Sequence, residues 1–361
     1  MKLDLPDKQS SWHLDEPFWR SKSIFGESLF FIRETPLAFP SARLLFPPAG
    51  PVQITSASRV IQYAHGGDYL VEADTGIVTL PAGSRIPFKE QADLYPGISQ
   101  EHCMPHKRGE EQVGLYFGEG HLFHDQQLEA SYDHHSSWQG FVPQGQLDRL
   151  PRTARKLQGP GPLIISIIGD SISTGCNASG LTGALPGMPP YPELWAEAIR
   201  RRRTGEVVLK NHAVSGTGMK YGLKVVDEVM NDAPDLVVIA YGMNDVGFTP
   251  IEDFVAQTAG ILKVIKERNQ ETETILVACM LGNPEWVYTP LENFFLFRDA
   301  LESLCKPGVA LADLTSLWAD LLRVKSYYDL TGNGVNHPND FAHRVHAQVL
   351  LDLLGFGSKT G

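Results

Sequence analysis

Four short segments carry residue types that together could perform acyl transfer. They read GDSIS (169–173), NHAVSG (211–216), GMND (242–245) and NHP (336–338). In chain order they offer a nucleophile in Ser171, a backbone N–H at Gly216, a side-chain amide in Asn244 and a base in His337. A serine needs a nearby base to attack a carbonyl, and the oxyanion that forms needs donors already in place. The four segments therefore predict an esterase-type serine hydrolase.

The elements that must position these residues can be read from the apolar pattern after about residue 160. Apolar runs alternate there with stretches of helical period, which is typical of a parallel sheet covered by helices on both faces. Strands are predicted at 163–168, 207–211, 236–241, 274–279 and 309–313, and helices at 192–202, 222–231, 251–269, 291–304, 314–324 and 341–354. Five such strands are enough for a flavodoxin-like sheet.

Three of the four segments directly follow a predicted strand. The carboxyl ends of parallel strands share one edge of the sheet, where open α/β folds place their sites. We therefore expect the backbone N–H groups of Ser171 and Gly216 and the amide of Asn244 to point into one pocket.

In these segments the chain resembles the SGNH hydrolases, also called the GDSL esterase and lipase family, from Gly169 to the last predicted helix. The resemblance implies a three-layer α/β/α domain with a five-stranded parallel sheet. It also implies that Ser171 is the nucleophile, that Ser171, Gly216 and Asn244 form the oxyanion hole, and that His337 is the general base. No cofactor is implied.

The chain departs from this family at the acid that usually stands three residues before the histidine, because Gly334 occupies that position. We expect Asp340, Asn333, Asp329 or a backbone carbonyl to accept the imidazole N–H instead. Asp340 is the candidate acid of a triad, and a Ser-His dyad with an asparagine or carbonyl acceptor is an equal alternative.

Residues 1 to about 150 have a different pattern, with short alternating segments at 69–72 and 77–80 separated by glycine-rich turns. Such spacing favours a small β-sandwich. We predict a β-sandwich accessory domain at 1–155 and a catalytic domain at 156–361, joined near the turn-rich residues 158–162.

A β-sandwich ahead of an SGNH domain is similar to certain carbohydrate esterases that remove acetyl groups from sugars. This resemblance implies a jelly-roll-like first domain, a short acyl group and a saccharide ester as substrate. Two alternatives remain at this stage. One is a lipase or lysophospholipase-like enzyme, which would need a long apolar channel. The other is a non-catalytic carbohydrate-binding protein with a degenerate site.

The composition argues against nucleic acid and membranes as partners. The formal net charge of −11 argues against nucleic acid, which attracts clustered lysine and arginine. No apolar run approaches the roughly 20 residues that cross a bilayer, so we expect a soluble protein without a membrane partner. The first residues lack a basic head and an apolar stretch, which favours a cytoplasmic location. The oligomeric state stays open.

Two histidine pairs in the N-terminal region have spacings that could suit a metal on a helix. They are His102 with His106 and His121 with His124. No helix is predicted there, and a zinc site also needs further ligands. We therefore expect polar loop positions and no metal.

Overall fold

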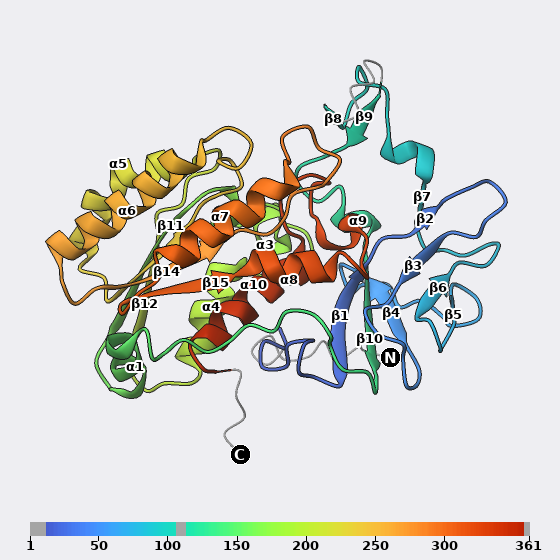
Figure 1. Ribbon diagram of the computed structural model, residues 1–361. Coiled ribbons are helices and arrows are strands. Elements are labelled where there is room, and N and C mark those ends of the chain that lie inside the picture. The colour runs from blue at the N-terminus through green and yellow to red at the C-terminus, as the bar shows by residue number, and fades with distance from the viewer. Residues whose placement is uncertain (1–11, 106–112, 357–361) are drawn as a thin grey trace.

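The computed structural model describes residues 12–105 and 113–356. Its C-terminal part contains a parallel sheet of five strands in the order β12-β11-β13-β14-β15 (Figure 1). The strands are β11 (Leu163–Gly169), β12 (Val207–Asn211), β13 (Leu236–Ala240), β14 (Glu273–Ala278) and β15 (Val309–Asp313). Each lies within one residue of its predicted bounds. The sheet is therefore confirmed, and its order places the strand before Ser171 between the strands that precede Gly216 and Asn244.

Helices cover both faces of this sheet, which confirms the three-layer architecture. One face packs against α5 (Met219–Val229), α6 (Ile251–Arg268) and α7 (Leu291–Ser303). The other packs against α4 (Tyr191–Arg200), α8 (Leu314–Leu321) and α10 (Asp340–Leu353). The shorter helices are α1 (Pro151–Gln158), α2 (Ser171–Thr174), α3 (Ser179–Thr182), α9 (Tyr327–Leu330) and the 3-10 turns η1 (Gln91–Leu94), η2 (His124–Gln126) and η3 (Met230–Asp232).

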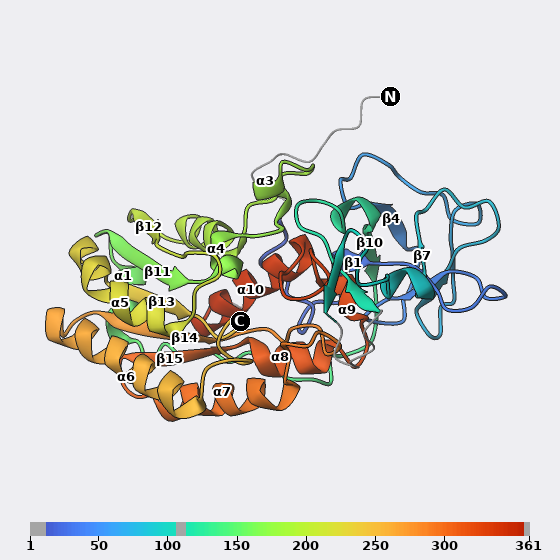
Figure 2. The same cartoon turned by 90° about the horizontal axis from the view of Figure 1, so that it is seen from above.

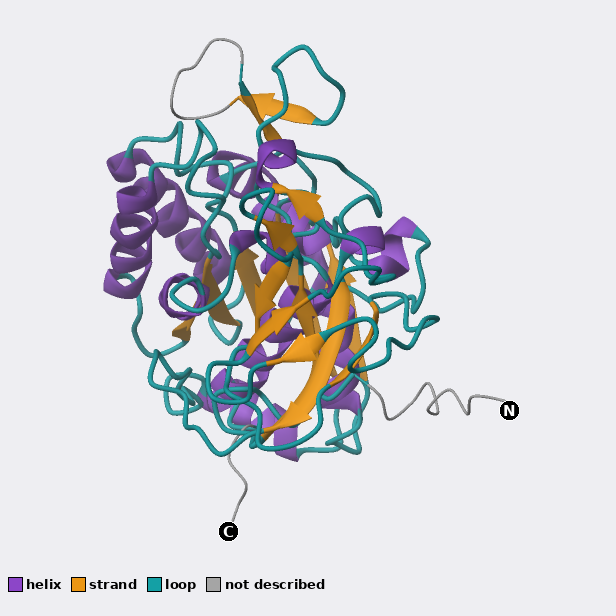
Figure 3. Ribbon diagram, turned by 90° about the vertical axis from the view of Figure 1, so that its right-hand side faces the viewer, coloured by secondary structure: helices purple, strands orange, loops and turns teal. Residues whose placement is uncertain are grey.

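The N-terminal region is rich in β-strands, as predicted. One antiparallel sheet has the order β1-β10-β4, with β1 (Ser23–Leu29), β4 (Gln53–Ser56) and β10 (Leu128–Asp133). A second has the order β5-β6-β3-β2-β7, with β2 (Ile32–Arg33), β3 (Ser41–Arg43), β5 (Leu70–Val71), β6 (Ile77–Thr79) and β7 (Lys89–Glu90). A hairpin of β8 (Cys103–Pro105) and β9 (Gly114–Tyr116) projects beside them (Figure 3).

The N-terminal strands and the C-terminal helices share one hydrophobic core. Leu29 and Ile54 belong to the same buried cluster as Trp318 and Leu350, and β1 lies against α9 and α10 (Figure 2). The predicted boundary between residues 155 and 156 falls inside α1. The division into two domains therefore remains a prediction, and in the described residues the two parts are packed together.

A buried ion pair also joins the two parts. Lys325, between α8 and α9, donates to Glu27 Oε1 of β1 at 2.6 Å and to the Arg43 carbonyl at 2.7 Å. Neither charged side chain reaches solvent. Buried charges are tolerated when they are paired and hydrogen-bonded, so this contact depends on both parts being in place.

No helix in residues 12–105 and 113–356 is both long and apolar enough to cross a membrane.

Candidate active site

Ser171 stands at the turn between β11 and α2, at the carboxyl edge of the sheet. Asp170 caps α2, because its side chain accepts the Ile172 N–H at 3.0 Å. Such a cap satisfies a free N–H at the start of the helix and stabilises the turn. Burial is the main cause that raises the pKa of Asp170 to about 7. Only 5% of the Ser171 surface is exposed to solvent, which suits a nucleophile at the bottom of a site.

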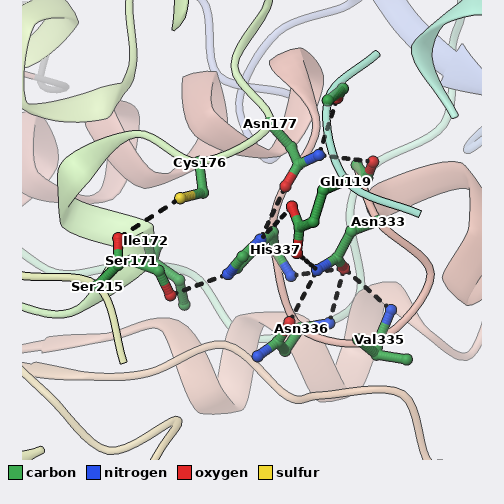
Figure 4. Close-up of polar contacts among 12 residues, drawn as sticks. Glu119, Ser171, Ile172, Cys176, Asn177, Ser215, Asn333, Val335, Asn336 and His337 are labelled. Atoms are coloured by element: carbon green, nitrogen blue, oxygen red, sulfur yellow. Dashed lines mark hydrogen bonds and ion pairs between the residues drawn. The ribbon is translucent and has the colours of Figure 1, made fainter. Parts of the chain in front are cut away.

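His337 lies in the loop before α10 and reaches back to the nucleophile. Its Nε2 is 2.9 Å from Ser171 Oγ (Figure 4). The loop is held by Asn333, whose Oδ1 accepts the backbone N–H groups of Val335, Asn336 and His337 at 3.0 Å each. The structure thus brings together the serine and the histidine, which are far apart in the sequence.

Asn177, in the loop after α2, decides which nitrogen of His337 carries the proton. Its Nδ2 donates to the carbonyls of Gly120 and Gly332 at 2.9 and 3.0 Å. A flipped amide would place Oδ1 against these two carbonyl oxygens, so the orientation of the amide is fixed. Asn177 Oδ1 is therefore the acceptor facing His337 Nδ1 at 2.8 Å. Nδ1 must carry the hydrogen, and Nε2 presents its lone pair to the Ser171 hydroxyl. This is the tautomer that a general base needs.

Glu119, from the N-terminal loop after β9, is the second acceptor at His337 Nδ1. Its Oε2 lies 3.3 Å from that nitrogen, and its Oε1 accepts from Asn333 Nδ2 at 3.1 Å. Figure 4 shows Glu119 and Asn177 converging on the same side of the imidazole ring, opposite Ser171.

The prediction that Asp340 orients His337 requires a correction. The hydrogen bonds of His337 Nδ1 go to Asn177 and Glu119, whereas Asp340 Oδ1 accepts the Ser179 N–H at 2.8 Å. Asp340 is the first residue of α10, so its side chain sits at the helix start and holds the loop before α3. Asp329, another candidate, accepts the Phe30 N–H at 2.7 Å.

The predicted oxyanion donors lie in the loops that follow the two strands beside β11. Gly216 has φ +76 in the loop after β12, a conformation that glycine adopts without strain. Ser215 Oγ is 3.1 Å from Thr174 Oγ1, which ties this loop to α2. Asn244, in the loop after β13, donates one amide hydrogen to the Thr217 carbonyl at 2.9 Å, and its amide nitrogen carries a second hydrogen that could bind an oxyanion. The arrangement fits an oxyanion hole beside Ser171.

The histidines of the second pair, His121 and His124, make ordinary polar contacts. His121 Nδ1 lies 2.6 Å from Asp125, and His124 Nε2 lies 2.7 Å from the Leu185 carbonyl. In the part of the chain that the structure describes, no group of three histidine, cysteine or acidic residues is arranged to hold a metal. His106 lies outside the described residues.

Comparison with known families agrees with this geometry. Residues 167–345, which run from the end of β11 through the later strands into the first half of α10, match the GDSL-like Lipase/Acylhydrolase family. This part of the chain is a GDSL-like lipase/acylhydrolase domain. The GDSL family is one of carboxylic ester hydrolases, and the match includes Ser171, Gly216, Asn244 and His337. A search of curated proteins found no match.

Solved structures resemble the GDSL part at low identity. A two-domain esterase active on acetylated mannans, crystallised with mannopentaose, is 18% identical with a TM-score of 0.48 over 61% of this chain. The aligned part spans 56% of that esterase. An acetyl xylan esterase is 21% identical with a TM-score of 0.40, over 52% of this chain and 98% of its own. A lipase from a goat rumen metagenome is 18% identical with a TM-score of 0.44, over 54% and 98%.

Proposed function

We propose that this GDSL protein is a serine esterase that removes short acyl groups, above all acetyl, from a saccharide. The observation that carries the proposal is the 2.9 Å contact between Ser171 Oγ and His337 Nε2, in the tautomer fixed by Asn177. A hydroxyl aligned on a neutral imidazole nitrogen is the arrangement that activates serine.

The reaction would run in two steps, acylation of Ser171 and then hydrolysis of the acyl-enzyme. Ser171 Oγ attacks the ester carbonyl while His337 Nε2 takes its proton, and the oxyanion is held by the N–H groups of Ser171 and Gly216 and by the Asn244 amide. The bond to the alcohol then breaks as His337 returns the proton to the leaving oxygen. Water repeats the sequence on the acyl-enzyme and releases the carboxylic acid and free Ser171.

Chain-length preference tests this proposal. We expect hydrolysis of p-nitrophenyl acetate, with kcat/KM falling by about tenfold or more for octanoate and longer esters. A preference for long acyl chains would identify a lipase-like enzyme instead. No turnover of any ester by folded protein would overturn the proposed function and favour a binding protein with a degenerate site.

Two exposed aromatic rings in the loops after β13 and β14 support a saccharide as the alcohol. Phe248 follows Asn244 by one turn and is 64% exposed, and Tyr288 in the loop after β14 is 40% exposed. Their ring centroids are 5.0 Å apart. Exposed rings at the edge of a site can stack on the apolar face of a sugar.

Replacing Phe248 by alanine is therefore expected to raise KM for an acetylated oligosaccharide by about five- to tenfold, because one stacking contact is lost. KM for p-nitrophenyl acetate should stay unchanged, since this small ester does not reach the rings. Phe39→Ala is the matched control, as Phe39 is equally exposed, at 62%, but lies between β2 and β3. Equal effects on both substrates would contradict the assignment.

A further inference from the structure

The position where the GDSL family usually has its acid is physically closed in this chain. Gly334 has φ +92, a conformation that L side chains rarely adopt. A Cβ built there would lie 2.4 Å from the Tyr116 carbonyl oxygen and 2.8 Å from a ring carbon of Phe123. Residue 334 therefore cannot carry an acid, because the N-terminal segment from β9 to η2 occupies the space.

The segment that fills this space also carries Glu119. Its backbone is fixed on both sides of that residue by groups that surround His337. The Gly118 N–H donates to the Asn333 carbonyl at 3.1 Å, and the Gly120 carbonyl accepts from Asn177 Nδ2 at 2.9 Å. The position of Glu119 is thus set by the backbone, even though its side chain is 52% exposed.

We propose that Glu119 is the positioning carboxylate of the active site, supplied by the N-terminal region in place of the acid missing at residue 334. This inference rests on the proposed function, because it concerns the same serine and histidine. When His337 takes the proton of Ser171 it becomes a cation. Asn177 fixes the tautomer but is neutral, whereas Glu119 brings a negative charge to Nδ1 at 3.3 Å.

The electrostatics of the loop agree with an ionised Glu119. Partial burial opposes its charge, but the contacts with His337, Asn333 and Asn177 outweigh burial and hold the pKa of Glu119 below its usual range. His343 of α10 also lies near His337. Burial lowers the pKa of His343 to about 3, so it stays neutral at the pH of an assay. The charge facing the imidazolium is therefore that of Glu119.

The test compares Glu119→Gln with the wild type. Glutamine keeps the shape and removes the charge, so we expect kcat for p-nitrophenyl acetate to fall by about ten- to a hundredfold with KM nearly unchanged. The loss is smaller than that of a missing triad acid because Asn177 still holds the tautomer.

Two further measurements separate positioning from a structural effect. Formate should restore part of the activity of Glu119→Ala, because an exposed loop leaves room for a small carboxylate at Nδ1. The matched control is Asp125→Asn, which removes a carboxylate from the same region that contacts His121 rather than His337. It should retain the wild-type kcat and pH profile.

An activity-independent readout distinguishes failure of this inference from failure of the proposed function. The Nδ1 proton of His337, assigned by its absence in His337→Gln, should give an NMR resonance at a different frequency in Glu119→Gln than in the wild type, because Glu119 Oε2 lies 3.3 Å from that nitrogen. An unchanged Nδ1 resonance, or a wild-type kcat in an active Glu119→Gln enzyme, would overturn the proposal. A wild type that hydrolyses no ester, with a shifted Nδ1 resonance in Glu119→Gln, would overturn the esterase proposal alone.

Discussion

Substitution of Ser171 by alanine is expected to lower kcat for p-nitrophenyl acetate by about 10⁴- to 10⁶-fold, the scale seen when a serine hydrolase loses its nucleophile. The proposed oxyanion donors remain in this variant, but no acyl-enzyme can form without the serine hydroxyl. Alanine is also a good helix former at the start of α2. The free energy of unfolding should therefore change little.

The controls make this result specific. Ser303→Ala, at the end of α7, removes another serine hydroxyl, one that bonds to the Ala300 carbonyl far from the sheet edge. It should keep full activity.

A fluorophosphonate reagent should label Ser171 in the wild type and leave Ser171→Ala unlabelled. In the proposed mechanism serine and histidine act as one unit, so adding His337→Ala to Ser171→Ala should lower kcat little further. Residual turnover near the wild-type level would show that another residue is the nucleophile.

The largest expected effect on stability comes from Lys325. Lys325→Met should lower the free energy of unfolding by about 3–5 kcal/mol, the usual cost of breaking a buried ion pair from one side. Among residues 12–105 and 113–356, the loss leaves the Glu27 carboxylate in the core with hydrogen bonds only from neutral groups, the Leu45 N–H at 2.8 Å and the Tyr132 hydroxyl at 2.6 Å. Urea unfolding followed by fluorescence and by activity measures the change.

Lys263→Met serves as the comparison. Lys263 faces Glu267 one turn away on α6, with both side chains largely exposed, so its removal should change stability by less than about 0.5 kcal/mol. Adding Glu27→Gln to Lys325→Met should recover part of the loss, because the unpaired charge disappears. A small effect of Lys325→Met alone would mean that water reaches Glu27 and that the two parts are less tightly joined than the structure indicates.

Much of the GDSL half could be predicted from local pattern. The near-continuous apolar run of β11 reads as a strand buried on both faces, and its bounds were predicted to within one residue. Ser171 and His337 were predicted as nucleophile and base from the four sequence segments, and the structure places Ser171 Oγ 2.9 Å from His337 Nε2. The order of the strands in the sheet brings Gly216 and Asn244 to the same edge as Ser171.

The groups around His337 Nδ1 could not be predicted in the same way. Glu119 lies 218 residues before the histidine, in a loop that carries no pattern of its own beyond two flanking glycines. Asn177 is only six residues after Ser171, and an asparagine with φ +65 is a feature that sequence can suggest, since asparagine tolerates this conformation. The role of Asn177 could not be predicted from sequence, because it depends on the two distant carbonyls that its amide nitrogen contacts.

Asp340 shows why sequence proximity misled the search for an acid. It is three residues after His337, but α10 begins there, and the helix directs the side chain to the Ser179 N–H. The absence of an acid at Gly334 was visible in the sequence. Its physical reason, a backbone carbonyl from Tyr116 in the space that a Cβ would need, belongs to the tertiary structure.

The close approach of Tyr116 to Gly334 also constrains how such a protein can evolve. A recombination event that paired this GDSL half with a different N-terminal half would leave a hole beside Gly334 and remove Glu119 in one step. Conversely, a lineage that regained an acid at residue 334 would first have to displace the segment from β9 to η2. The two halves of the gene are therefore expected to be inherited together, with residues 116–120 and 334 changing in concert.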